Sequence, residues 1–475
     1  MRLPQRPPQD IAFPLQAIEW SLAGEQSAAT EEYVRRANDA CWHWDDLRRR
    51  PTPPGIDHRQ AWAAVQFSRA GHFQKLPIDF GPSGGAQKLR FWVPPLLQEW
   101  LHRVDLGAGG SIGGPSLDRL DDDRERHLVN SLMEEAIASS QLEGASTTRR
   151  MAKEMLRTKR KPRNANERMI LNNYRAILHI RQVKNTPMSP ALLCELQEML
   201  TRDVLESEAI GRFRRPDELI EVADNESGEA VFTPPSADSI ASRIDQLCAF
   251  ANDAGGPFVH PVIKAIALHF AIGYIHPFVD GNGRTARALF YWFMLRQGYW
   301  LFEFLPISRM FLAAPTKYAR AYLLTETADG DLTYFLHHHL DVVMRAIEDL
   351  HAYIARKQRE KKESWRVLAQ HPGLNDRQTQ IIRDVLHDDM REFTVAGHRE
   401  TSGVGNATAR SDLLGLVNLG LLQSRKRGQA HVYFPAADLR SRLAAQVEPN
   451  PPVEDGEPPG KVVKTVKRIT PPKAD

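Results

Sequence analysis

Cysteine is scarce in this chain: Cys41, Cys194 and Cys248 are the only three in 475 residues, and no two of them form a CxxC pair. A cysteine zinc site and a redox pair are therefore excluded. The N-terminus has no continuous apolar run of the kind that a signal peptide needs, and no run of about 18 apolar residues could span a bilayer. We expect a cytoplasmic protein with no membrane partner.

An excess of charge of one sign is also missing. The 62 Lys and Arg residues against 59 Asp and Glu residues leave a net charge of +3, so any basic surface must be local. The sequence contains no GxxxxGK[ST], GxGxxG, HExxH or HRDxxxxN, which are the usual motifs of phosphate-binding and catalytic sites. A site for such chemistry must therefore use another pattern.

The periodicity of the chain predicts its organisation. Residues 1–123 are rich in Trp, Pro and Arg and carry no recognisable chemistry, whereas apolar residues recur at three- and four-residue steps through residues 124–350. A charged linker helix is expected over 351–371, and residues 372–440 read as three helices followed by a hairpin, the winged-helix order. The Pro- and charge-rich residues 441–475 should be disordered. We predict a mainly α fold: an all-helical domain plus a small C-terminal α+β domain.

One segment interrupts the helical pattern. ELIEVADNESGEAVFTPP, residues 218–235, contains two short extended runs around Asn225, Ser227 and Gly228. This arrangement predicts a β-hairpin in a helical setting.

The stretch HPFVDGNGRTAR, residues 276–287, combines a histidine, a carboxylate, two glycines and two arginines. Pro277 disfavours helical geometry at His276, so the preceding helix should end there and a loop should begin. Gly281 and Gly283 allow positive φ and a close approach of the backbone to a ligand. If the next helix begins at about Arg284, its first N–H groups form a cradle for an anion.

The charged side chains of this stretch extend that interpretation. Arg284 and Arg287 are three residues apart and share one face of the first helical turn, which suits a polyphosphate. Asp280 could hold Mg²⁺ together with substrate phosphates. His276 could then accept a proton from an attacking hydroxyl. Taken singly, each of these residues has an ordinary structural explanation, and it is their combination that indicates a site.

HPFVDGNGRTAR resembles the signature of the Fic family, HPFx(D/E)GNGRxxR, at every specified position. The resemblance implies a helical Fic domain over about 124–350 that transfers AMP from ATP to a Ser, Thr or Tyr hydroxyl of a target protein, which could be the chain itself. It implies that His276 is the general base, that Asp280 binds Mg²⁺, and that phosphates are held by Gly281, Asn282, Gly283, Arg284 and Arg287.

The resemblance also gives the hairpin a role. In the family, a corresponding flap lies over the active site and pairs with an extended segment of the target. Val231, Phe232 and Thr233 would form the second strand of this flap. The alternative is a surface hairpin without a partner.

A second motif lies upstream of the first. SSQLEG resembles the family's inhibitory pattern (S/T)xxxE(G/N), with Ser139 and Glu143 four residues apart on a helix expected over 131–146. A carboxylate paired with Arg287 would occupy the partner meant for a phosphate and add negative charge there. The same Glu143 could instead assist hydrolysis, so removal of AMP from a modified protein stays open.

The C-terminal unit raises a rival function. NATARSDLLGLVNLG carries Arg410 on a candidate recognition helix, and QSRKRGQAHVYF carries Arg425, Lys426 and Arg427 on a candidate wing. These features are compatible with a DNA-binding regulator, in which the Fic domain is secondary. Protein contacts or intramolecular packing are the alternatives for the same unit.

Overall fold

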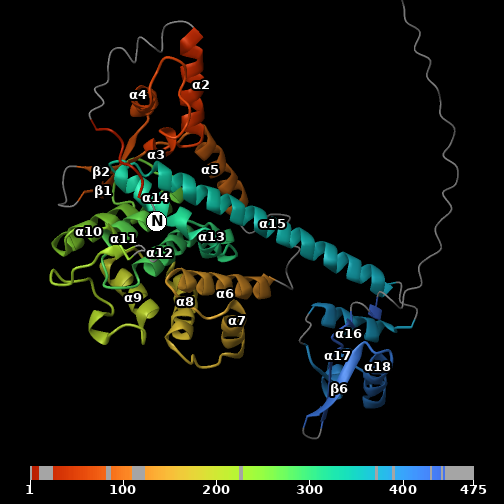
Figure 1. The fold of residues 1–475 in the computed structure, drawn as a ribbon. Helices are drawn as coiled ribbons and strands as arrows, with labels where there is room; N and C mark the ends of the chain where they lie inside the picture. Colours follow the sequence, from red (N-terminus) through yellow and green to blue (C-terminus); the bar gives the residue numbers. More distant parts are fainter. Residues whose placement is uncertain are drawn as a thin grey trace, which may run out of the picture. The chain divides into compact units, whose positions relative to one another are not determined.

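The computed structural model describes residues 3–9, 25–81, 87–109, 124–223, 228–369, 373–387, 391–427, 430–439 and 442–443. By its internal contacts the chain divides into two compact units, Met1–His351 and Ala352–Asp475. Helices make up most of the described structure (Figure 1), so the predicted mainly α fold class is confirmed. Among the described helices, none is both long enough and apolar enough to cross a membrane.

The centre of the first unit is a pair of buried helices, α11 (Pro261–Ile275) and α12 (Asn282–Arg296). Nearly every residue of both is buried, because they are apolar around most of their circumference. Helix α12 packs against α11 and against α6, α8 and α9. The helices around this pair are α6 (Arg124–Leu142), α7 (Arg149–Thr158), α8 (Ala165–Val183), α9 (Pro190–Thr201), α10 (Ile240–Ala251), α13 (Ile307–Ala313), α14 (Pro315–Thr327) and α15 (Thr333–Ala369).

The N-terminal segment adds helices and a small antiparallel sheet to the same unit. Its elements are α2 (Glu25–Asp39), α3 (Trp44–Leu47), α4 (His58–Ala70), β1 (Gln74–Asp79), β2 (Lys88–Phe91) and α5 (Pro95–Ala108). Trp42, Trp44 and Trp62 form a small separate core. Leu76 and Phe91 of the sheet join the main core that contains α11 and α12. The N-terminal segment therefore packs directly on the helical domain.

The interruption in the helical pattern is a short antiparallel hairpin of β3 (Val222–Ala223) and β4 (Ala230–Phe232). Val231 and Phe232 lie in β4, and Thr233 follows it. Gly228, in the connection, has a φ of 71°. Asn225 and Ser227 of the predicted turn lie outside the described residues.

In the residues described for the second unit, the end of α15 is followed by α16, α17, α18 and a three-stranded sheet in the order β5-β7-β6. The elements follow one another as α16 (Asp376–His387), β5 (Phe393–Thr394), α17 (Val395–Ser402), α18 (Asn406–Asn418), β6 (Leu422–Arg427) and β7 (Ala430–Pro435). Its own apolar core includes Ile382, Leu413, Leu416 and Tyr433. Of the predicted tail, residues 441–475, only 442–443 are described.

Candidate functional site

His276 closes α11 and opens the loop that leads to α12. Its backbone is left-handed, with φ 51° and ψ 57°, an uncommon conformation that costs roughly 1–2 kcal/mol for a residue other than glycine. Its Nδ1 lies 3.0 Å from the carbonyl oxygen of Gly273, so Nδ1 carries the proton and Nε2 remains an acceptor. Burial lowers the pKa of His276 below its ordinary value, which keeps the ring neutral at physiological pH.

The glycines of the loop form the start of α12. Gly281 precedes the helix with a φ of 86°, a conformation suited to glycine. The helix begins at Asn282, two residues earlier than predicted, so Gly283 lies in its first turn and has no positive φ. A Cβ built on Gly283 would collide with Oε1 of Glu143. The missing side chain at position 283 therefore leaves room for an anion at the helix N-terminus.

Asn282 stabilises the loop through its side chain. Its Oδ1 accepts a hydrogen bond of 2.9 Å from the backbone nitrogen of Phe278, and its Nδ2 donates one of 2.9 Å to the carbonyl oxygen of the same residue. Both polar atoms of the Asn282 side chain are thus bonded to the backbone of Phe278. For an anion, Asn282 has only its backbone N–H at the start of the helix.

Arg287 joins α12 to the end of α6. Its Nε donates to Oγ of Ser139 at 2.9 Å, and its Nη2 donates to the carbonyl oxygen of Ser139 at 2.9 Å and to Oε1 of Glu143 at 2.8 Å. The Arg287 side chain is 3% exposed and that of Glu143 is 25% exposed. Burial would raise the pKa of Glu143, but Arg287 and Arg284 together hold it below its ordinary value. An ionised carboxylate therefore occupies the anion position beside Gly283.

Glu143 lies in a turn directly after the helix. Helix α6 ends at Leu142, four residues before the predicted end at 146. The backbone nitrogen of Glu143 donates to the carbonyl oxygen of Ser140 at 3.1 Å, and Gly144 follows with a φ of 92°. The carboxylate thus sits on the last, non-helical turn of this segment.

Arg284 points to a different neighbourhood from Arg287. Its guanidinium is buried, with Nη1 donating to the carbonyl oxygen of Leu200 at 3.0 Å and Nη2 to Oδ2 of Asp280 at 3.0 Å. Its Nε is buried and has no hydrogen-bond partner in the described part of the chain. Arg284 therefore braces the loop against α9, and one of its donors is left without an acceptor among the described residues.

Asp280 is the one carboxylate on this loop, and its side chain is 46% exposed. Its Oδ1 accepts a hydrogen bond of 2.6 Å from the backbone nitrogen of Gly281. No group of three or more His, Cys, Asp or Glu side chains is placed to hold a metal ion within the described ranges. This donor set fits Mg²⁺ as that ion is bound in many phosphate sites, by one carboxylate, substrate phosphates and water.

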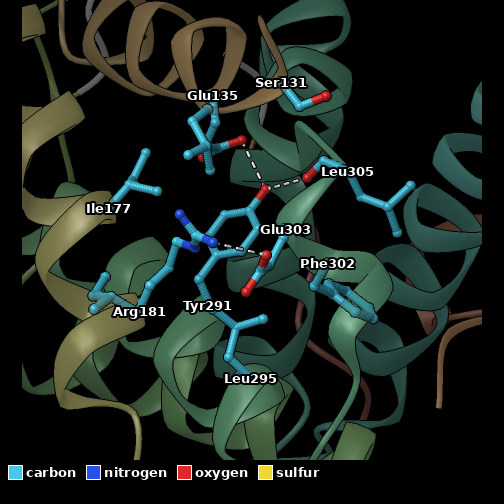
Figure 2. Close-up of a pocket in the computed structure, with 11 residues that line it drawn as sticks. Ser131, Glu135, Ile177, Arg181, Tyr291, Leu295, Phe302, Glu303 and Leu305 are labelled. Atoms are coloured by element: carbon cyan, nitrogen blue, oxygen red, sulfur yellow. Dashed lines mark hydrogen bonds and ion pairs between the residues drawn. The ribbon is translucent and has the colours of Figure 1, made fainter. Parts of the chain in front are cut away.

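A second polar cluster fixes α6 on α12, and the sequence did not reveal it. Figure 2 shows Glu135 and Tyr291 pointing toward each other inside a pocket that Arg181 and Glu303 also line. The Glu135 carboxylate accepts hydrogen bonds from the Tyr291 hydroxyl at 2.8 Å, from the backbone nitrogen of Ser308 at 2.9 Å and from the Ser308 hydroxyl.

The positions of these contacts follow the helix repeat. Glu135, Ser139 and Glu143 are spaced by four residues, and so are Arg287 and Tyr291. Glu135 meets Tyr291 while Ser139 and Glu143 meet Arg287, so the two segments run antiparallel. The sequence motifs include Ser139, Glu143 and Arg287. They do not include Glu135 or Tyr291, so the contact between those two residues was not predicted.

The flap residues lie beside the end of α11. The ring centroids of Phe232 and Tyr274 are 5.4 Å apart, and Tyr274 is two residues before His276. On its other side, Tyr274 stacks on Phe80 of the N-terminal segment at 4.8 Å. The predicted flap is therefore close to the loop that carries the histidine.

Comparison with known proteins gives one consistent family. The Fic/DOC family matches residues 187–294, which include the whole HPFVDGNGRTAR stretch. Protein adenylyltransferase fic-1 of Caenorhabditis elegans is 35% identical over 68 residues, 14% of this chain and 13% of that protein. Protein adenylyltransferase Fic of Drosophila ananassae is 32% identical over 111 residues, 23% of this chain and 22% of that protein.

A solved structure, a Fic family protein from Desulfovibrio desulfuricans, covers 71% of this chain and 96% of its own at 18% identity with a TM-score of 0.47. The chain spans less than a quarter of the length of the two curated relatives.

Proposed function

From the match of residues 187–294 to the Fic/DOC family, we propose that the chain belongs to this family and transfers AMP from ATP to a Ser, Thr or Tyr hydroxyl of a target protein. The observation that carries the proposal is the pairing of a neutral His276, whose Nε2 is an acceptor, with the anion position at the start of α12. A base and a phosphate site on one short loop are what nucleotidyl transfer to a hydroxyl requires.

In the proposed reaction the target hydroxyl oxygen attacks the α-phosphorus of ATP. A new P–O bond forms to the target, the bond between the α-phosphorus and the β-bridging oxygen breaks, and pyrophosphate leaves. Nε2 of His276 takes the hydroxyl proton. Arg287 and the N–H groups of α12 hold the β- and γ-phosphates, so that the leaving group lies opposite the attacking oxygen.

Asp280 would hold Mg²⁺ together with phosphate oxygens of the nucleotide, and the ion would neutralise negative charge on them. To do so, Asp280 must share its carboxylate between the ion and Arg284, which now binds Oδ2. Its 46% exposure leaves the side chain accessible for that exchange.

We further propose that Glu143 holds the enzyme in an inhibited state. The carboxylate occupies the space beside Gly283 and binds the guanidinium of Arg287, which is the group assigned to the γ-phosphate. A phosphate entering this position would meet negative charge and an occupied arginine. ATP would then bind weakly or in an unproductive orientation.

Removal of AMP from a modified protein is the alternative reaction for the same site. A lowered pKa keeps Glu143 ionised, so its carboxylate could accept a proton from a water molecule that attacks the phosphorus. Loss of AMP release in a Glu143→Gly variant would favour this direction, whereas a gain of AMP transfer favours the inhibitory role.

The transfer reaction is tested by incubating the Glu143→Gly protein with α-³²P-labelled ATP, CTP, GTP or UTP in a cell lysate. We expect label from ATP on protein side-chain hydroxyls, located by mass spectrometry, and none with Glu143→Gly combined with His276→Ala. Label from another nucleotide would revise the donor, and no label from any of the four would refute the transfer reaction.

Duplex DNA binding by the second unit is a separate candidate function, favoured by strand β6. Gln423 to Arg427 are all exposed, and the run contains three successive cations. Arg425 and Arg427 are 59% and 71% exposed and share one partner, Glu392, so phosphates could replace that carboxylate at little cost. On α18, Asn406, Thr408 and Arg410 are exposed as well.

DNA binding is tested by the fluorescence anisotropy of a labelled random-sequence duplex with the full chain. Arg425→Ala with Arg427→Ala should weaken binding and reduce the slope of log K against log salt by about 1.8, which corresponds to two phosphate contacts. Glu392→Ala should strengthen it. If the duplex does not bind at low salt, a protein contact becomes the better role for this unit.

A further inference from the structure

The segment that precedes the flap braces the catalytic loop at several points. The backbone nitrogen of Gly211 donates to Oε1 of Gln197 at 2.7 Å, and Nε2 of the same glutamine donates to the carbonyl oxygen of Asp280 at 3.2 Å. The rings of Phe213 and Phe278 are 5.4 Å apart. The backbone of the loop is thus supported from one side by residues 211–214.

Arg214 makes the contacts at the end of this segment. Its backbone nitrogen donates to the carbonyl oxygen of Pro277 at 2.8 Å, and its Nε donates to the carbonyl oxygen of His276 at 2.8 Å. Its Nη2 donates to the carbonyl oxygen of Pro235, where the chain leaves the hairpin. One side chain therefore joins the backbone of the proposed base to the end of the proposed flap.

The environment of Arg214 is unusual for a cation. The residue is 8% exposed, and none of the carboxylates that the structure describes lies within ion-pair distance of it. Glu218 acts on Arg214 only from beyond that distance, and burial lowers the pKa of the guanidinium. Burial of a charge without an ion-pair partner costs free energy that backbone hydrogen bonds offset only in part. The buried, unpaired Arg214 is therefore not explained by a gain in stability. It is explained if the residue fixes the position of the hairpin relative to the His276 loop.

We propose that Arg214 is a positioning residue that sets the register between a target segment on the flap and the base His276. The inference rests on the proposed transfer function, because the flap matters only if a target strand pairs with it. A target hydroxyl must lie within hydrogen-bond reach of Nε2, and a misplacement of about 1 Å can cost on the order of 100-fold in rate. Arg214 contacts the backbone of His276 and the end of the flap at Pro235. The separation of these two parts sets the distance between the target hydroxyl and Nε2.

Arg212 provides a matched control two residues earlier in the same segment. Its guanidinium forms a paired contact with Glu218, at 2.8 and 2.5 Å, and its side chain is 24% exposed. Its other hydrogen bonds go to the backbone of Glu208 and Phe213, and among the described residues it makes none to 276–283. Arg212→Met removes a guanidinium of the same segment without removing a contact to the catalytic loop.

The first experiment measures automodification by labelled ATP in the Glu143→Gly background. Arg214→Met should lower the rate by about 10- to 100-fold while the KM for ATP changes less than about twofold, because Arg214 does not touch the anion position. The automodification rate of Arg212→Met should stay within about threefold of the rate of the Glu143→Gly protein. A rate that Arg214→Met leaves unchanged, or one lowered equally by both variants, overturns the proposal.

The pH profile separates positioning from a general loss of structure. The charged groups that act on His276 are Arg214, Asp280 and Glu143, the last removed in this background. Loss of the Arg214 cation favours the imidazolium form of His276 and so raises its pKa. Arg214→Met should therefore move the acid limb of the pH–rate profile to higher pH. Arg214→Lys keeps the charge but not the forked contact, so it should lower the rate and leave the limb in place.

The second experiment does not depend on transfer activity. Hydrogen exchange of the chain with Glu143 intact should become at least about tenfold faster in Arg214→Met at both 230–235 and 276–280, as expected for loss of hydrogen bonds from a charged donor. Arg212→Met should change neither segment. Faster exchange in only one segment, or in none, overturns the coupling. If Glu143→Gly shows no transfer at all, the proposed function fails, and the exchange data still decide the role of Arg214.

Discussion

Replacement of Glu143 by glycine is the perturbation that tests the inhibited state most directly. It removes the carboxylate beside Gly283 and leaves Arg287 with Ser139 as its remaining α6 partner. Glycine suits the last turn of a helix, so α6 should keep its structure up to Leu142. The substitution thus changes the anion position and little else.

The size of the effect follows from the contact that is lost. The 2.8 Å bond between Glu143 and Arg287 is charge-assisted and joins a 25% exposed side chain to one that is 3% exposed. Such a bond contributes about 1.5–3 kcal/mol, which corresponds to roughly a 10- to 150-fold change in an equilibrium constant. We expect Glu143→Gly to bind ATP tighter by about this factor and to automodify faster by well over tenfold.

The assay is isothermal titration of ATP, followed by automodification with labelled nucleotide. Glu143→Gln, which keeps the bulk but not the charge, should fall between Glu143→Gly and the unaltered chain. Glu134→Gln is the matched control, because Glu134 lies on α6, the helix that leads to Glu143, but binds Arg149 and Lys153. If Glu143→Gly binds ATP no tighter, with an unchanged circular dichroism spectrum and Tm, the carboxylate does not exclude phosphate. Adding Arg287→Ala should abolish the gain.

Four further predictions concern the site. In the Glu143→Gly background, His276→Ala should reduce transfer by about 10²- to 10⁴-fold with ATP affinity retained in calorimetry. With His276 present, burial lowers its pKa below the ordinary value, so the rate should rise with pH and reach its plateau at lower pH than an ordinary histidine would give. Asp280→Ala should remove the stimulation by Mg²⁺ in a metal titration, and stimulation that persists would locate the ion elsewhere. Glu135→Ala should lower the free energy of unfolding in urea by about 1–3 kcal/mol and raise basal transfer, because the backbone N–H and hydroxyl of Ser308 lose their acceptor, the Tyr291 hydroxyl keeps only the carbonyl oxygen of Leu305, and α6 loosens. Glu135→Gln, which keeps an acceptor, should do less, and equal effects of both would contradict the anchoring role.

The sequence predicted the elements whose signals are local. Pro277 marked the end of α11, and the glycines after it marked the start of α12 within two residues. The helical period of residues 124–350 predicted helices there, as the structure has them. These features depend on neighbours along the chain, so spacing and residue type are sufficient to identify them.

Contacts between distant residues could not be read in the same way. Glu135 and Tyr291 are 156 residues apart, and neither belongs to a motif that the sequence analysis singled out. Arg214 resembles any loop arginine until its carbonyl partners are known. Arg284 was expected to face phosphates, and that contact stays a prediction; its hydrogen bonds to Leu200 and Asp280, which arise because the first turn of α12 packs on α9, could not be read from spacing.

The space beside Gly283 has a consequence for how inhibition would respond to nucleotide. Glu143 and a phosphate would compete for one position, and the carboxylate is tethered to it by its own chain. A tethered competitor acts at a fixed effective concentration that dilution of the protein does not lower. Inhibition of this kind would raise the apparent KM for ATP and leave the rate at saturation nearly unchanged, so the activity of the intact chain would follow the ATP concentration around it.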